Sequence, residues 1–308
     1  MHAPALSILV LLATHADVAV PSAPQRIFGG EPTLPGEFDA VVGLRIGAFQ
    51  CSGTLISPTH VLTAAHCLAD LPADAVIEVF FGERDTPGMQ VTSAGFAVHP
   101  EFCPPSEGCD EDLHDFGVVE LETPLAVDDI PPILWKQSEW DATMKEGATV
   151  TLVGYGRSDN DDGTPTIGVK RKVAVEIDWL TDSGLEFFAG GEGKDSCEGD
   201  SGGPAFVRMA DGSYRLAGVL SRGSVPCGDG GVYGIPYAAA CWIRDTYGVD
   251  LTEGYCGTCE CLETSQVDDG CACRTSPDRG PSGGPIFLSV AAVLFGVRRM
   301  ARTGRSRS

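Results

Sequence analysis

Residues 195–204 of the chain read DSCEGDSGGP, and the other motifs are best understood in relation to this stretch. Glycines and acidic residues crowd both sides of Ser201, a pattern typical of a tight loop that holds a hydroxyl outward. Backbone N–H groups in such a loop can point at a developing negative charge on a substrate oxygen. The stretch therefore indicates a serine nucleophile.

A serine hydroxyl is a weak nucleophile near neutral pH, so it needs a base and a carboxylate that orients the base. Two upstream motifs supply candidates. Residues 63–67 read TAAHC and contain His66, and residues 114–119 read HDFGVV and contain Asp115. We expect His66 to accept the Ser201 proton and return it to the leaving amine, and Asp115 to fix the histidine tautomer.

With these motifs in the order His, Asp, Ser, residues 27–249 resemble the chymotrypsin/trypsin family of serine endopeptidases. Short apolar runs separated by Gly, Pro and Asp turns independently favour an all-β sandwich or barrel. The resemblance implies two antiparallel six-stranded β-barrels with the active site between them. Apolar residues at helical spacing over 238–247 predict the closing C-terminal helix. The resemblance also implies an oxyanion hole made by the backbone N–H groups of Gly199 and Ser201.

The same resemblance makes predictions about specificity. Asp195 lies six residues before Ser201, where trypsin-like members place the carboxylate that binds Lys or Arg of the substrate. The other residues implied at the substrate site are Ser196, Ser221, Gly223 and Gly231. Arg222 stands where tryptophan is common, so we expect an altered preference at neighbouring substrate positions. Alternatively, Arg222 folds toward Glu198 or Asp195, which would weaken the specificity prediction. The pocket rim at 227–231 is short and could differ.

Residues 26–30 read RIFGG and resemble the activation junction of the family. Cleavage after Arg26 would free the ammonium group of Ile27 to pair with Asp200 and order the pocket. A buried ion pair that lacks one partner costs several kcal/mol, so we expect a nearly inactive precursor. The alternative is that Arg26 is an ordinary linker residue.

The chain has 12 cysteines, an even number that suits a disulfide framework in an exported protein. The resemblance implies the pairs Cys51–Cys67 and Cys197–Cys227, and closeness in sequence suggests Cys103–Cys109. The absence of cysteine between 109 and 197 points to a pared-down, bacterial version of the family. The remaining cysteines favour disulfides over zinc, with the pairing open: Cys241, Cys256, Cys259, Cys261, Cys271 and Cys273.

The segments outside the peptidase-like region predict export and attachment. We expect a signal peptide at 1–16, with a buried first strand as the alternative, and a short propeptide at 17–26. The peptidase domain is expected at 27–250 and a Cys-rich linker at 251–281. Residues 282–308 join a short apolar run to an arginine cluster. This tail resembles bacterial, particularly myxobacterial, C-terminal sorting signals, and a simple membrane anchor is the alternative.

The charge of the chain limits the kinds of molecule that it can bind. The net charge of −22 makes the chain a poor binder of nucleic acid, whereas it suits basic or neutral polypeptides. The acidic loop at 101–112 either attracts basic substrate residues or is a solvated face. No cofactor is expected, and no metal either, because the segment 82–85 falls at the calcium loop of the family but lacks its second glutamate.

The sequence as a whole predicts a secreted or surface-attached, monomeric serine endopeptidase made as a zymogen. Two alternatives share the fold. One is a catalytically silent binding protein, although no member of the predicted triad is missing. The other is an esterase-like hydrolase, which would need neither Asp195 nor the junction at Arg26.

Overall fold

The computed structural model describes residues 27–252 with gaps at 86–88, 104–113, 160–164, 167 and 225–226, together with Gly254 and Leu262. The chain divides into a compact unit, residues 1–273, and a second unit, residues 274–308. The predicted signal peptide, the propeptide and the tail lie outside the described residues. Among the described residues, no helix has the length and apolar character needed to span a bilayer.

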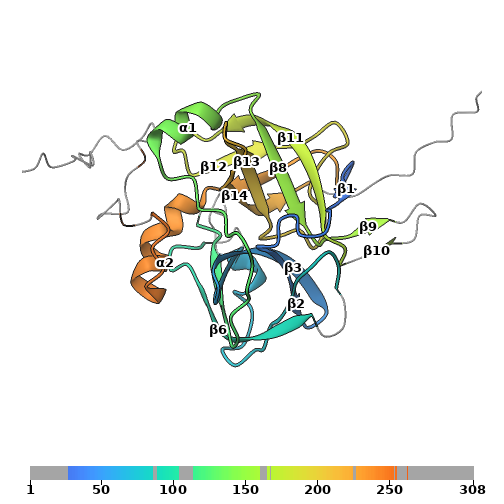
Figure 1. Cartoon of the computed structure of the whole chain (residues 1–308), viewed down its shortest axis with the longest axis vertical. Helices are drawn as coiled ribbons and strands as arrows, with labels where there is room; N and C mark the ends of the chain where they lie inside the picture. The colour runs from blue at the N-terminus through green and yellow to red at the C-terminus, as the bar shows by residue number, and fades with distance from the viewer. Residues whose placement is uncertain are drawn as a thin grey trace, which may run out of the picture. The chain divides into compact units, whose positions relative to one another are not determined.

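The first half of the peptidase region forms a closed antiparallel barrel with the strand order β2-β3-β4-β7-β6-β5 (Figure 1). Alternate residues of these strands, among them Val42, Leu44 and Val61, fill the barrel interior. The strands are β2 (Val41–Ile46), β3 (Phe49–Ser57), β4 (His60–Thr63), β5 (Glu78–Phe80), β6 (Gln90–Val98) and β7 (Gly117–Leu121).

The second half forms another antiparallel barrel, in which β11, β12, β15, β14, β13 and β8 follow one another and a β8–β11 pairing closes the ring. Two short additions are β1 (Glu31–Pro32), paired with β11, and the hairpin of β9 (Ser158–Asp159) and β10 (Pro165–Thr166). The barrel strands are β8 (Thr149–Gly154), β11 (Arg171–Leu180), β12 (Glu186–Ala189), β13 (Pro204–Arg208), β14 (Tyr214–Gly223) and β15 (Gly231–Gly234). The prediction of two six-stranded barrels is confirmed.

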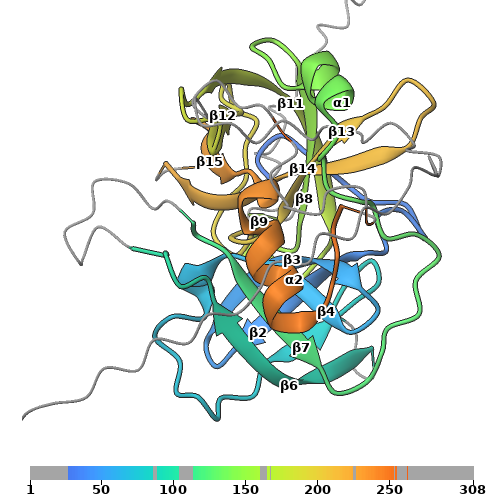
Figure 2. The same ribbon diagram turned by 90° about the vertical axis from the view of Figure 1, so that its left-hand side faces the viewer.

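Helices are few in the described part of the chain. The predicted closing helix is present as the 3-10 turn η3 (Pro236–Ala239) followed by α2 (Ala240–Tyr247). It crosses the first barrel beside β4 and β7 (Figure 2), where Tyr247 packs edge-on against His60 and Trp242 against His99. The chain therefore ends the second barrel by packing back onto the first.

A second helix, α1 (Gln137–Thr143), was not predicted, because 125–146 reads as a crossing rich in Pro and Asp. Only Trp140 is buried within it, so its helical periodicity is too weak to recognise in the sequence. Arg215 of β14 holds the helix through a two-pronged contact with Glu139.

Tyr155 joins the two barrels. Its side chain is fully buried, and its hydroxyl lies within hydrogen-bond distance of the carbonyl oxygens of Val41 and Gly82, both in the first half. The ring meets Phe80 edge-on at 5.0 Å between centroids. Nearby, the buried Lys170 donates a hydrogen bond to the Phe38 carbonyl at 3.0 Å. These polar contacts satisfy backbone groups that would otherwise be buried without partners.

Packing continues past residue 250. Leu251 and Leu262 are both buried, and Leu262 belongs to the core of the second barrel. The Leu262 N–H donates a hydrogen bond to the Tyr237 hydroxyl at 2.9 Å. The described part of the predicted Cys-rich linker therefore contributes side chains to the peptidase fold.

Candidate active site

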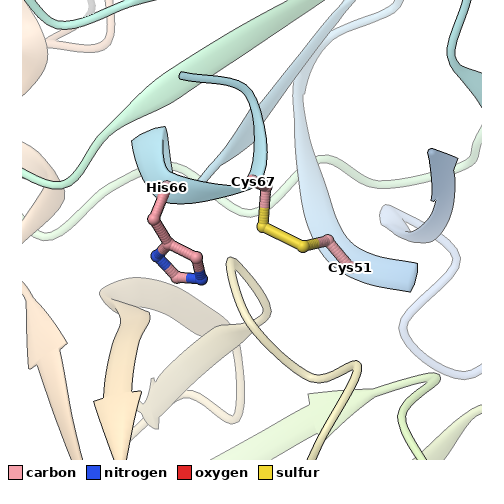
Figure 3. Close-up of side chains that lie close together, drawn as sticks. All are labelled: Cys51, His66 and Cys67. Carbon is pink, nitrogen blue, oxygen red and sulfur yellow. A yellow bond between two sulfur atoms is a disulfide. The ribbon is translucent and has the colours of Figure 1, made fainter. Parts of the chain in front are cut away.

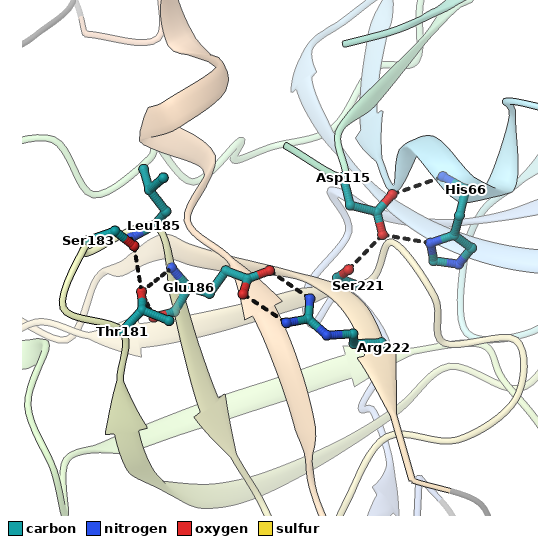
Figure 4. Close-up of polar contacts among 8 residues, drawn as sticks. All are labelled: His66, Asp115, Thr181, Ser183, Leu185, Glu186, Ser221 and Arg222. Atoms are coloured by element: carbon teal, nitrogen blue, oxygen red, sulfur yellow. Dashed lines mark hydrogen bonds and ion pairs between the residues drawn. The ribbon is translucent and has the colours of Figure 1, made fainter. Parts of the chain in front are cut away.

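The pairing of β4 with β7 brings His66 and Asp115 together. Thr63 lies opposite Gly117 in this antiparallel pair, so the residues after β4 and before β7 meet at one end of the barrel. His66 lies in the 3-10 turn η1 (Ala65–Cys67). The Asp115 carboxylate accepts hydrogen bonds from the His66 backbone N–H at 2.8 Å and from Nδ1 at 2.7 Å (Figure 4). With the proton held on Nδ1, Nε2 is left as the basic nitrogen.

Ser221 links this pair to the second barrel. Its hydroxyl donates to the Asp115 carboxylate at 2.7 Å, and Ser221 and Asp115 are 5% and 3% exposed (Figure 4). Asp115 therefore accepts three hydrogen bonds from two residues. The family resemblance implies Ser221 only at the substrate site, because a lone serine in a strand gives no sign of which face it occupies.

The Cys51–Cys67 disulfide holds the histidine turn. It ties β3 to the residue that follows His66, with the Cα atoms 6.5 Å apart (Figure 3). The Ser201 carbonyl lies against the same region, since it accepts the Ser52 N–H at 2.8 Å. The carbonyl oxygen is also 3.9 Å from Cys67 Sγ. The structure thus brings the predicted nucleophile loop against the strand and turn that position His66.

The Ser201 loop depends on a glycine at position 199. Gly199 has φ +91°, and a Cβ there would lie 3.0 Å from the Gly156 Cα, so both conformation and space require glycine. Within the described part of the chain, no hydrogen bond uses the N–H of Gly199 or Ser201. Both donors can therefore serve an acceptor from outside the chain.

Asp200 is buried beneath this loop. Its carboxylate accepts hydrogen bonds from the N–H groups of Gly156 at 2.7 Å and Cys197 at 2.9 Å. Burial nevertheless raises the pKa of Asp200 to about 7, because few charges compensate it. None of the ion pairs found among the described residues involves this carboxylate.

The activation segment lies close by. Ile27 is 2% exposed and packs in the second barrel core, and Phe28 exchanges two backbone hydrogen bonds with Asp195. The predicted partners Ile27 and Asp200 therefore belong to adjoining segments. Arg26 lies outside the described residues.

Asp195 is enclosed by backbone donors. Oδ1 accepts the Ser196 N–H at 2.7 Å, and Oδ2 accepts those of Gly228 and Gly230 at 3.2 and 3.0 Å. Burial is the main influence and raises the pKa of this carboxyl, while the hydrogen bonds oppose the shift. The Cys197–Cys227 disulfide joins the two loops that carry these groups.

Two of the predicted wall residues lie next to each other and close to Ser196. Gly223 pairs with Gly231 between β14 and β15, and a Cβ on Gly231 would lie 3.3 Å from Ser196 Oγ. These contacts bring Gly223 and Gly231 together with Ser196, whose N–H donates to Asp195, whereas Ser221 donates to Asp115.

Arg222 does not fold toward either residue considered in the sequence analysis. It forms a two-pronged pair with Glu186 of β12, with N–O distances of 2.7 and 2.8 Å (Figure 4). Glu198 instead pairs with Arg157 at 3.3 Å. Arg222 lies opposite Val232 of β15, just after a register shift at Ser221, and its side chain reaches Glu186 on the neighbouring strand β12. Glu186 was missed because nothing in the sequence marks it as the partner of Arg222.

Two other predicted sites are described only in part. Cys103 is disulfide-bonded, but its expected partner Cys109 lies outside the described residues. In the segment at the calcium-loop position, Asp85 pairs with Arg45, and Glu83 accepts the Gly36 N–H at 3.2 Å.

Comparisons with known proteins agree with this geometry. The trypsin family model matches residues 27–243. The chain is 30% identical over 252 residues to serine protease filzig of Drosophila melanogaster, covering 72% of the chain and 14% of filzig. It is 29% identical to melanization protease 1 of the same species, covering 66% of the chain and 60% of that protein. Spermosin of Halocynthia roretzi is 28% identical, with 67% of the chain and 58% of spermosin covered.

The chain thus spans less than two thirds of the length of these three relatives. All three come from animals, so they do not support the prediction of a bacterial type.

Proposed function

This chain belongs to the trypsin family of serine endopeptidases, and we propose that it cuts polypeptides after Arg and Lys, following export as a precursor. The observation that supports this specificity is the environment of the Asp195 carboxylate. This carboxylate is 1% exposed and is fixed by three backbone N–H groups. A cationic substrate side chain would gain most from such a preorganised, desolvated carboxylate.

The proposed chemistry uses His66, Asp115 and Ser201. His66 Nε2 takes the proton from Ser201 Oγ as the oxygen attacks the substrate carbonyl, and Asp115 stabilises the imidazolium. The proton then passes to the leaving amine, and water hydrolyses the acyl-enzyme by the reverse sequence. The Gly199 and Ser201 N–H groups bind the oxyanion, each such donor being typically worth about 2.7–4 kcal/mol.

Activation would follow from the position of Ile27. Cleavage after Arg26 creates an ammonium group next to the buried Asp200, whose carboxylate gains a charge partner. Because Asp200 immediately precedes Ser201, this pairing would order the oxyanion-binding loop. Ile27 already packs in the second barrel core and Phe28 already pairs with Asp195. These contacts support only a short movement of the N-terminal segment after cleavage.

The specificity is tested with matched peptides that carry Arg, Lys, Phe or Ala before the cut bond. The enzyme is the mature chain with Ile27 as its free N-terminus, and Ser201→Ala is the control. We expect a strong preference for Arg and Lys that Asp195→Ser abolishes. Preference for Phe or Ala would overturn the pocket assignment. Turnover of simple esters without peptide cleavage would favour the esterase alternative.

We further propose that residues 1–16 direct export and that residues 282–308 form a sorting tail of the bacterial, myxobacterial-like kind. The cysteine motif, the short apolar run and the arginine cluster support this interpretation. Mass spectrometry of the protein recovered from culture medium and from the cell surface is the test. An intact tail on fully released protein would contradict it.

A further inference from the structure

Three side chains that can bind a metal ion lie together beside Asp115: His99, Glu101 and His114. One ring nitrogen of each histidine and one carboxylate oxygen of Glu101 lie within 4.8 Å of one another. His99 is 5% exposed, whereas the Glu101 side chain is 70% exposed, so the group reaches from a buried position to the open surface. The other such group among the described residues includes the Cys51–Cys67 disulfide, whose sulfur atoms are bonded to each other.

Strand pairing brings these residues together. Val98, the last residue of β6, lies opposite Gly117, the first residue of β7, so the chain leaving one strand meets the chain entering the other. The His99 N–H donates a hydrogen bond to the Phe116 carbonyl at 2.9 Å. The His99 and His114 rings lie nearly parallel, with 4.8 Å between their centroids. The position of the group therefore follows from the register of β6 and β7.

His114 is unusual in its backbone and in its ring contacts. Its φ of +57° falls in the left-handed region, which a residue with a side chain rarely adopts and which recurs at functional sites. Its Nδ1 is buried and has no hydrogen-bond partner among the described residues. Its Nε2 lies 3.6 Å from a Glu101 oxygen, which is too long for a hydrogen bond. Both ring nitrogens thus lack a hydrogen-bond partner in the described part of the chain, although buried polar atoms normally have one.

From this geometry we propose that His99, Glu101 and His114 bind a divalent transition-metal ion, and that Zn²⁺ suits these donors best. Two imidazole nitrogens and one carboxylate oxygen form a common Zn²⁺ ligand set that leaves a fourth position for water. Ca²⁺ and Mg²⁺ prefer sites built of oxygen atoms. Ligand atoms around a tetrahedral Zn²⁺ lie about 3.4 Å apart. Binding would therefore contract the group and turn the His114 ring out of its stack with His99.

A bound ion would join the chain on either side of residues 104–113. His99 and Glu101 precede this segment, and His114 follows it and adjoins Asp115. An ion that binds the folded chain in preference to the unfolded chain stabilises the fold. The net charge of −22 favours the approach of cations. The ion site is independent of the proposed function, because metal binding needs no peptidase activity.

Isothermal titration calorimetry of the mature Ser201→Ala protein with Zn²⁺ tests the site without self-digestion. We expect one bound Zn²⁺ whose affinity falls at least about tenfold in Glu101→Gln and in His114→Asn, since even the loss of an outer partner typically costs about 10–100-fold. Glu101 is largely exposed, and asparagine tolerates the left-handed backbone at position 114, so both variants should fold. His60→Gln is the matched control, because His60 also packs edge-on against an aromatic residue of α2.

Thermal unfolding gives a second measurement. Zn²⁺ should raise the Tm of the Ser201→Ala protein and of its His60→Gln derivative, and it should raise the Tm of the Glu101→Gln derivative much less. Unchanged Zn²⁺ affinity in Glu101→Gln or in His114→Asn would overturn the proposal, because the ion would then bind another part of the chain. An equal loss of affinity in His60→Gln would overturn it as well, since the effect would not be confined to the three proposed ligands.

Discussion

At the scale of single residues, Asp115 connects the two halves of the active site. It accepts hydrogen bonds from His66 in one barrel and Ser221 in the other. A buried polar group without such partners costs free energy. The orientation of the imidazole thus depends on a hydroxyl group outside the predicted triad.

Ser221→Ala should test this dependence. A hydrogen bond to a charged group contributes about 1.5–3 kcal/mol, so we expect kcat/KM to fall by roughly ten- to a hundredfold. The acidic limb of the pH–rate profile should shift as well, because His66 must be unprotonated to accept the Ser201 proton and its hydrogen bond to Asp115 changes. Ser213→Ala, in the turn before β14, is the matched control. An unchanged profile in Ser221→Ala would show that the hydroxyl does not support Asp115.

Asp200 provides a second prediction at this scale, on the stability of the precursor. Its folded pKa of about 7 lies above the ordinary aspartate value, so the folded state binds this proton more tightly than the unfolded state. The stabilisation is complete below about pH 4 and is lost as the pH rises through about 7. We therefore expect the Tm difference between the Ser201→Ala precursor and its Asp200→Asn derivative to change over this range.

Cleavage after Arg26 should remove this pH dependence of the Tm difference, because the Ile27 ammonium favours the ionised carboxylate of Asp200. Differential scanning calorimetry of cleaved and uncleaved Ser201→Ala protein between pH 4.5 and 8 makes the comparison. Identical pH dependence in the two forms would count against a pairing of Ile27 with Asp200.

At the scale of structural elements, Tyr155 is a polar link between barrels. Burial raises the pKa of its phenol, so the hydroxyl remains a donor at all relevant pH values. Tyr155→Phe keeps the ring against Phe80 but leaves the Val41 and Gly82 carbonyls without this partner. We expect a loss of about 1–3 kcal/mol in the free energy of unfolding, measured by urea denaturation.

Tyr214→Phe is the control for this substitution. The Tyr214 ring also packs against aromatic neighbours, Phe38 and Phe206, but its hydroxyl makes no hydrogen bond to the described residues. Tyr214→Phe should lower the free energy of unfolding by less than about 0.5 kcal/mol. Equal losses in the two variants would mean that ring packing, rather than the Tyr155 hydroxyl, joins the barrels.

The elements also show what sequence reasoning could predict. Motifs around His66, Asp115 and Ser201 are contiguous, so they predict a triad without knowledge of strand order. The helix α1 is different, because its single buried residue, Trp140, leaves no periodic pattern. The Arg222–Glu186 pair depends on the register of β14, β15 and β12. Charge and spacing in the sequence do not specify that register, so the partner of Arg222 was not predictable.

At the scale of the whole peptidase region, one apolar cluster contains residues of both barrels. Val41, Leu62 and Phe116 of the first half pack with Val153 and Phe206 of the second. Neither barrel can bury this cluster alone. Both halves also contribute to the active site, since His66 and Asp115 come from the first and Ser201 and Asp195 from the second.

Unfolding of the mature enzyme should therefore be one cooperative transition. Tryptophan fluorescence, far-UV circular dichroism and activity are expected to change together with urea concentration. Ser201→Ala protein serves as the control for self-digestion during the measurement. Two separated transitions, with activity lost in the first, would show that the barrels unfold independently.

Leu262 is a described residue beyond 250 that is anchored in the peptidase fold. Its side chain is seated in the second barrel core and its N–H is held by Tyr237, at the turn that leads into α2. On a protein tethered through residues beyond this point, tension would load the Tyr237 turn first. The strand that carries Ser221 and Arg222, β14, would not bear this load directly. The substrate groove would therefore keep its geometry while the tethered enzyme is under tension.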